Sequence, residues 1–209
     1  MKRTWALAAL AASLISSLTW AQSGPEQKLA AVLQNPKSVE AAVEAGRKAS
    51  LFCGNCHGAD GNSGIGEVPN LAGQNPAFLL EQIRKFGVGQ RKNEFMQKLI
   101  KMLSDDDKVN IALYFARQSV KAQPPGDPAL MSKGYEWFSK DCFRCHGDQG
   151  RGNEKIARIA GQQVPYLVLT LTRYRDRNGE RNDPLMATNT AMLKDPDIRA
   201  LAEYVSRLR

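Results

Sequence analysis

A six-residue unit occurs twice in this chain and constrains what the rest of it can do. Its two copies are residues 53–58, CGNCHG, and residues 142–147, CFRCHG. Each contains C-x-x-C-H, the attachment pattern of a c-type haem, in which two thiols form thioethers to one porphyrin and the adjacent histidine ligates its iron. The sequence therefore predicts two covalently bound haem c groups. The predicted attachment residues are Cys53, Cys56, Cys142 and Cys145, and the predicted iron ligands are His57 and His146.

Two other kinds of site use paired cysteines, and neither accounts for the whole pattern. The two units contain all four cysteines and both histidines of the sequence. A zinc site of four thiolates needs no histidine after each pair, and its two pairs usually lie close together in the sequence. Two disulfides suit an oxidising compartment but leave both histidines without a role.

The second half of the chain repeats the first beyond the C-x-x-C-H units. Residues 71–74, LAGQ, recur as residues 159–162, IAGQ, and the next twelve residues align without a gap. Residues 164–171 are rich in β-branched side chains and could form a strand in isolation, but their partner in the first half has helical periodicity. We therefore expect an all-α fold made of two tandem copies of one small domain.

A proline-rich segment separates the two copies. Residues 121–128, KAQPPGDP, have the composition of a linker. The predicted organisation is a signal peptide over 1–21, an N-terminal domain with haem 1 over 22–120, this linker, and a C-terminal domain with haem 2 over 129–209.

The N-terminus has the pattern of an export signal. Lys2 and Arg3 precede an apolar run over 5–18, and small residues at Thr19 and Ala21 suit cleavage after Ala21. The run is shorter than the roughly 20 residues that a membrane-spanning helix needs. We expect an exported, periplasmic protein.

The net charge favours acidic partners. Without Lys2 and Arg3 the chain keeps 27 basic and 21 acidic residues, a formal charge of +6. This balance favours docking to acidic protein surfaces and allows transient association with anionic membranes. We expect redox partner proteins, such as a membrane respiratory complex or a terminal oxidase, and no nucleic acid.

The sixth ligand of each iron decides between electron transfer and catalysis. No histidine or cysteine is left over, whereas methionines form two matched pairs, Met96 with Met186 and Met102 with Met192. Met96 lies 39 residues after His57 and Met186 lies 40 after His146, both in the expected loop before the last helix of each half. We predict Met96 and Met186 as ligands and expect Met102 and Met192 to pack beside a helix start. Thioether ligation raises the reduction potential and closes the iron to small molecules.

Together these features resemble the dihaem cytochrome c4 family over about residues 38–209. The resemblance rests on both C-x-x-C-H-G units, Pro69 with residues 71–74, Met96 and Met186, and the helix start at 103–107. It implies two tandem class I cytochrome c domains, His/Met ligation, and periplasmic electron transfer towards terminal oxidases.

The resemblance also implies two local contacts. In such domains the first and last helices cross, which suits Gly46 and Gly134 against Tyr114 and Tyr204. In addition, a proline carbonyl after the motif accepts a hydrogen bond from the ligating histidine. Pro69 fits this role.

The matching position in the second half is Ala157, which departs from the family pattern. Its carbonyl is less fixed in orientation, so the bond to His146 is in question. From this departure we predict unequal potentials for the two haems.

The predicted function is therefore a soluble dihaem electron carrier of the cytochrome c4 type and not an enzyme. One alternative is an electron-transfer subunit of a periplasmic oxidoreductase, similar to that of flavocytochrome c sulfide dehydrogenases. Another is a dihaem peroxidase or thiosulfate-oxidising enzyme, which would need an open or unusually ligated iron.

Overall fold

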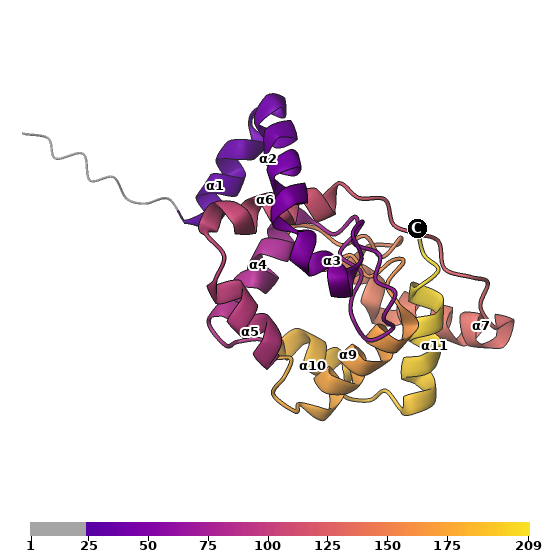
Figure 1. Ribbon diagram of the computed structural model, residues 1–209. Coiled ribbons are helices and arrows are strands. Elements are labelled where there is room, and N and C mark those ends of the chain that lie inside the picture. Colours follow the sequence, from indigo (N-terminus) through magenta and orange to yellow (C-terminus); the bar gives the residue numbers. More distant parts are fainter. Residues whose placement is uncertain (1–23) are drawn as a thin grey trace, which may run out of the picture.

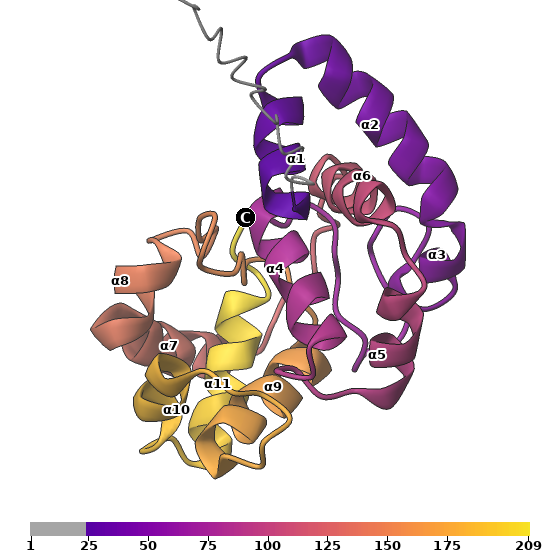
Figure 2. The same ribbon diagram turned by 90° about the vertical axis from the view of Figure 1, so that its left-hand side faces the viewer.

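In the computed structural model, the described residues are 24–209, and the predicted signal peptide over 1–21 lies outside them. The described part contains helices and no strand, as predicted. The helices form two lobes, one from the first half of the chain and one from the second (Figures 1 and 2). The helices of the first lobe are α1 (Pro25–Leu33), α2 (Pro36–Ala49), α3 (Leu51–His57), α4 (Pro76–Gly87), α5 (Glu94–Lys101) and α6 (Asp105–Ala116). Those of the second are α7 (Pro128–Trp137), the π-helical turn η1 (Phe138–Cys142), α8 (Phe143–His146), α9 (Val164–Asp176), α10 (Pro184–Thr190) and α11 (Asp195–Val205).

Each lobe has its own hydrophobic core. The first core is built from buried residues between Leu29 and Phe115, and the second from buried residues between Phe138 and Val205. Residues 121–127, between the lobes, form no regular secondary structure, and α7 begins at Pro128. The chain therefore folds as two tandem helical domains.

In each domain the helix that precedes the C-x-x-C-H unit, α2 or α7, crosses the last helix at a glycine, as expected. A Cβ atom on Gly46 of α2 would collide with the backbone carbonyl of Asn110 and the Cβ of Tyr114 in α6. A Cβ on Gly134 of α7 would collide in the same way with Ala200 and Tyr204 in α11. Only glycine lets the two backbones approach this closely.

The sequence signals for helix starts are satisfied locally. The Asn35 side chain accepts a hydrogen bond from the backbone of Lys37 at the start of α2, and Ser104 accepts one from Asp107 at the start of α6. Such capping supplies partners for backbone donors that the helix itself cannot satisfy. Residues 164–171, which could have formed a strand, lie in α9 as the internal repeat predicts.

The loops that follow the two motifs meet between the domains, in the middle of the molecule (Figure 1). Buried Asn70, Gln74 and Gln162 lie in this contact. Across residues 24–209, no helix is both long enough and apolar enough to span a membrane.

Candidate haem-binding site

Both C-x-x-C-H units line one cavity of about 520 Å³ that extends across the two domains. Its walls include Cys53, Cys56 and His57 from the first unit and the matching residues of the second. Most other lining side chains are apolar and come from the helices that follow each motif. The fold thus places both predicted attachment sites in one apolar chamber.

The two histidines are held in the same way. His57 is 8% exposed, and its Nδ1 lies 2.9 Å from the carbonyl oxygen of Pro69. His146 is 9% exposed, and its Nδ1 lies 2.9 Å from the carbonyl oxygen of Ala157. The hydrogen bond to His146 is therefore present although no proline stands at position 157. Because the two contacts have the same length, the departure at Ala157 gives no structural reason for unequal haem potentials, which stay a prediction.

This contact fixes the form of each imidazole. A carbonyl oxygen can only accept, so Nδ1 of His57 and of His146 carries the proton and leaves the Nε2 lone pair free. Burial lowers the pKa of both histidines, which favours their neutral form. A neutral imidazole with a hydrogen-bonded Nδ1–H is the form that ligates a metal through Nε2.

All four cysteines are free of disulfides, and neither Cys53 nor Cys142 has the character of an activated thiol. Burial raises the pKa of Cys53, and burial together with Asp141 raises that of Cys142 to about 11, the opposite of an activated thiol. Within residues 24–209, no group of three or more His, Cys, Asp and Glu side chains could hold a metal ion.

The predicted methionine ligands line the same cavity as the histidines. The expected loop contains a short helix in each domain, and Met96 and Met186 are the third residues of α5 and α10. Asn93 and Asp183 cap these helices: each side chain accepts a hydrogen bond from the backbone N–H of the methionine, both at 3.0 Å. The backbone of the two methionines is thus positioned by matched contacts.

The expectation that Met102 and Met192 pack beside a helix start is wrong. Their side chains are 77% and 72% exposed, and neither lines the cavity. Leu103 packs against the first core and Leu193 is buried in the second, so the apolar contact at each helix start comes from the next residue.

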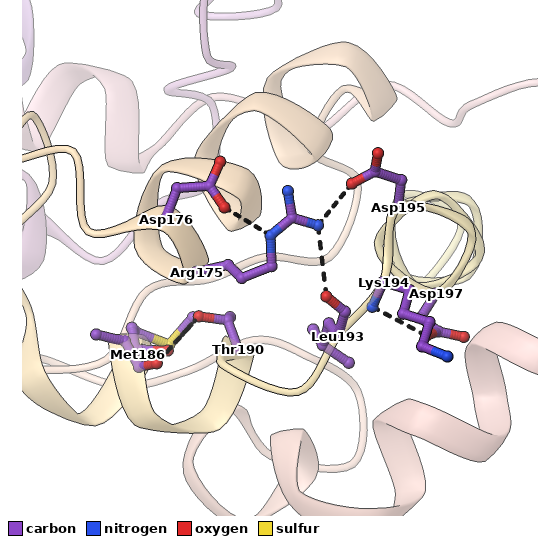
Figure 3. A network of polar contacts seen from close by, with 9 residues as sticks. Arg175, Asp176, Met186, Thr190, Leu193, Lys194, Asp195 and Asp197 are labelled. Atoms are coloured by element: carbon purple, nitrogen blue, oxygen red, sulfur yellow. Dashed lines mark hydrogen bonds and ion pairs between the residues drawn. The ribbon is translucent and has the colours of Figure 1, made fainter.

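A polar network braces the segment that carries Met186 (Figure 3). Arg175, in the last turn of α9, donates to Asp195 at 2.6 Å and to the carbonyl oxygen of Leu193 at 3.4 Å. The Thr190 hydroxyl donates to the carbonyl oxygen of Met186 at 2.7 Å. Arg175 thereby ties the end of α9 to the start of α11, on either side of α10.

Two arginines supply positive charge to the cavity. Arg91 and Arg181 both line it, one from each domain, and neither has an ion-pair partner among residues 24–209. Arg91 donates to the hydroxyl of Tyr166 at 3.2 Å and to the side-chain oxygen of Gln82 at 3.2 Å, and Arg181 also donates to Tyr166. Burial, followed by the repulsion of Arg181, lowers the pKa of Arg91 to about 10.

This surplus of positive charge also acts on Tyr166. Burial alone would raise the pKa of Tyr166, but Arg181 and Arg91 outweigh it and lower the pKa to about 8. A cavity with apolar walls and half-buried cations that lack an ion-pair partner suits a flat apolar group that carries carboxylates. Haem, with its two propionates, has this chemistry, so the residues present fit the cofactor that the motifs predict.

The sequence interpretation overlooked Arg91 and Arg181, although a signal for them exists. Each stands five residues before the predicted methionine ligand of its domain. The roles of Tyr166 and Gln82 have no such signal, because the equivalent positions in the other half are Phe78 and Thr170.

Comparison with known proteins finds cytochromes. The cytochrome c family model matches residues 131–209, which contain the second C-x-x-C-H unit. Cytochrome c4 from Pseudomonas aeruginosa is 34% identical over 176 residues, which cover 78% of this chain and 87% of the relative. The thiosulfate dehydrogenase electron acceptor of Stutzerimonas stutzeri is 30% identical over 77% of this chain and 80% of its own length.

A solved structure shows the same arrangement of helices. The crystal structure of reduced recombinant cytochrome c4 from Pseudomonas stutzeri superposes with a TM-score of 0.74 at 33% identity. The match covers 80% of this chain and 98% of that one. The two-domain helical fold is therefore shared with this protein.

Proposed function

Because this chain belongs to the dihaem cytochrome c4 family, whose members carry two covalently bound haem c groups and transfer electrons, we propose that it is a periplasmic electron carrier. It would pass electrons between respiratory-chain proteins, in the direction of a terminal oxidase. One observation carries the proposal: each domain brings one histidine and one methionine to a common cavity. Haem supplies a one-electron couple, and the protein decides what else can reach the iron.

The proposed ligand set follows the two domains. Cys53 and Cys56 would hold haem 1 through thioethers, and His57 and Met96 would ligate its iron. The second set would be Cys142, Cys145, His146 and Met186. With a histidine and a methionine bound to each iron, no position would be open to a substrate, which would favour electron transfer over bond-making chemistry.

The proposed organisation completes the assignment. Residues 1–21 would direct export and be removed, leaving a mature chain that starts at Gln22. The two domains would span 22–120 and 129–209 around the linker over 121–128. Mass spectrometry of a periplasmic fraction should give the mass of the chain from Gln22 plus two haem groups. A full-length chain in the cytoplasmic fraction would contradict the export proposal.

The optical spectrum of the purified protein tests the ligation. The ferric form should show the weak long-wavelength band of iron–methionine bonding at the strength of two haems. Met96→Leu and Met186→Leu should each remove half of it, whereas Met102→Leu and Met192→Leu, with their exposed side chains, serve as matched controls. A half-strength band in the unaltered protein, with a high-spin component, would contradict closed coordination of both irons.

A second candidate function is favoured by one relative. The thiosulfate dehydrogenase electron acceptor of Stutzerimonas stutzeri matches this chain over most of both lengths, so a sulfur-oxidising enzyme is a candidate donor. Stopped-flow measurements give the rate at which this protein is reduced by a thiosulfate dehydrogenase with its substrate and by a quinol-oxidising respiratory complex. The faster of the two reductions identifies the favoured donor. Co-purification with a catalytic subunit would instead favour a role as a resident subunit.

A further inference from the structure

The glutamines of the repeated AGQ segments reach across the domain interface. The side-chain amide of Gln162 contacts the backbone of Asn70 twice: its oxygen accepts from the Asn70 N–H at 2.8 Å, and its nitrogen donates to the Asn70 carbonyl at 3.0 Å. Both residues are 7% exposed. Hydrogen bonds in such a buried setting are strong and costly to leave unmade.

Gln74 makes the reciprocal contact from the first domain to the second. Its oxygen accepts from the N–H of Arg158 at 2.7 Å, and its nitrogen donates to the Arg158 carbonyl at 2.8 Å. Asn70 and Arg158 occupy equivalent positions of the internal repeat, four residues before Gln74 and Gln162. The two contacts are therefore related as a pair.

The contacted backbone is the same backbone that holds the histidines. The peptide group between Pro69 and Asn70 accepts the Nδ1–H of His57 through its carbonyl oxygen and donates to Gln162 through its N–H. The peptide group between Ala157 and Arg158 links His146 to Gln74 in the same way. Each histidine is thus connected, through a single peptide group, to a glutamine of the opposite domain.

We propose that Gln74 and Gln162 are positioning residues that set the haem potentials crosswise. Gln162 in the C-terminal domain adjusts haem 1, and Gln74 in the N-terminal domain adjusts haem 2. An acceptor on its N–H polarises a peptide group and makes its carbonyl a better acceptor for the histidine. A stronger Nδ1–H hydrogen bond raises the basicity of a ligating imidazole, which favours the ferric iron. The inference rests on the proposed roles of His57 and His146 as iron ligands.

The test is a potentiometric titration of the holoprotein with each haem followed by its hyperfine-shifted NMR signals. Gln162→Met removes both hydrogen bonds at similar side-chain volume and should raise the midpoint potential of haem 1 while haem 2 keeps its value. Gln74→Met should raise the midpoint potential of haem 2 while haem 1 keeps its value. In the reduced protein, the Nδ1–H resonance of His57 should move upfield in Gln162→Met, which reports the weakened bond directly.

Gln163→Met is the matched control. The Gln163 side chain also crosses the interface, donating to the carbonyls of Ile65 and Val68 at 2.9 and 2.6 Å, but it does not contact the peptide group that holds His57. It should leave both potentials in place. An equal shift in Gln163→Met and Gln162→Met would mean that interface loosening, and not this peptide link, moves the potential.

A second variant covers the case in which Gln162→Met does not fold. Gln162→Glu keeps an oxygen for the Asn70 N–H and should not raise the potential of haem 1. The proposal is overturned if Gln162→Met shifts the midpoint potential of haem 2 alone, raises both midpoint potentials equally, or shifts neither. For Gln162→Glu, a shift of the haem 2 potential alone or an equal rise of both potentials would overturn it. A normal long-wavelength band in these variants shows that His/Met ligation is intact, so failure of the crosswise effect is distinguishable from failure of the proposed ligation.

Discussion

Arg91 of the first domain donates a hydrogen bond of 3.2 Å to the hydroxyl of Tyr166 in the second. Arg181 of the second domain donates to the same hydroxyl. The contact lies on the wall of the cavity that contains both C-x-x-C-H units. One phenol oxygen therefore serves two guanidinium groups from different domains, which couples domain docking to the charge around the haem site.

Replacing Tyr166 with phenylalanine should destabilise the protein while preserving its shape. Phe78 fills the equivalent position in the first domain, so the change is compatible with the fold. It leaves two half-buried donors without their shared acceptor, which should cost about 1 kcal/mol of unfolding free energy. Denaturant unfolding of the holoprotein measures the loss. Tyr135→Phe, at a side chain that is 56% exposed, is the control and should change stability by less than about 0.5 kcal/mol. Equal losses in the two variants would contradict a specific role for the Tyr166 hydroxyl.

Replacing Arg91 with leucine should lower the reduction potential. A fixed positive charge beside the haem disfavours the extra charge of ferric iron, so its removal favours oxidation, by on the order of 1 kcal/mol at an effective dielectric constant near 20. Spectroelectrochemical titration measures the shift. Lys101→Leu removes an exposed cation of the same domain as a control and should have a much smaller effect, because solvent screens it. A rise in potential in Arg91→Leu would contradict this electrostatic argument.

Alanine at either crossing glycine should be strongly destabilising. A Cβ on Gly46 or Gly134 would fall on the backbone of the facing helix, which cannot move aside as a flexible side chain can. Overpacking of this kind costs about 1–3 kcal/mol. Gly64→Ala is the control, since a Cβ there meets nothing within 4 Å. Thermal unfolding should show a clear loss for Gly46→Ala and Gly134→Ala and little change for Gly64→Ala. Near-native stability in both crossing variants would mean that the helices separate easily.

The sequence contains enough to predict the repeat, the helices and the cysteines and histidines that line the cavity. The C-x-x-C-H units and the capped helix starts depend on local chemistry, the glycine–tyrosine crossings follow from the family resemblance, and the structure shows each of them. The contacts of Gln74 and Gln162 could not be predicted, because they depend on how the two domains dock and not on either domain alone.

The hydrogen bond between His146 and Ala157 shows a different limit. The Ala157 carbonyl accepts this bond without a proline, and it lies just after a turn that begins at Asn153. The Asn153 side chain accepts from the backbone N–H groups of Lys155 and Ile156, and the Asn153 backbone N–H donates to the Ile156 carbonyl at 2.9 Å. Comparison of equivalent positions in the repeat shows only that the proline is missing and cannot reveal that the bond is kept.

Arg175 gives the second domain a support that has no equivalent in the first, where Gly87 occupies the matching position. Asp176 and Asp195 raise the pKa of Arg175, and the side chain ties α9 to the start of α11 around the segment that carries Met186 (Figure 3). Arg175→Met should loosen this segment and make the proposed bond between Met186 and iron easier to break. Methionine ligation should then be lost at a lower denaturant concentration for haem 2, with haem 1 unchanged.

The long-wavelength band followed during denaturant titration measures this loss, because it reports each iron–methionine bond. Arg199→Met replaces an exposed arginine of α11 and is the matched control. We expect Arg175→Met to lose half of the band at a lower denaturant concentration than the unaltered protein. Arg199→Met should lose it at the same concentration as the unaltered protein. If both halves of the band were lost together in Arg175→Met, the arginine would stabilise the whole protein and not the Met186 segment, and the two domains would unfold as one unit.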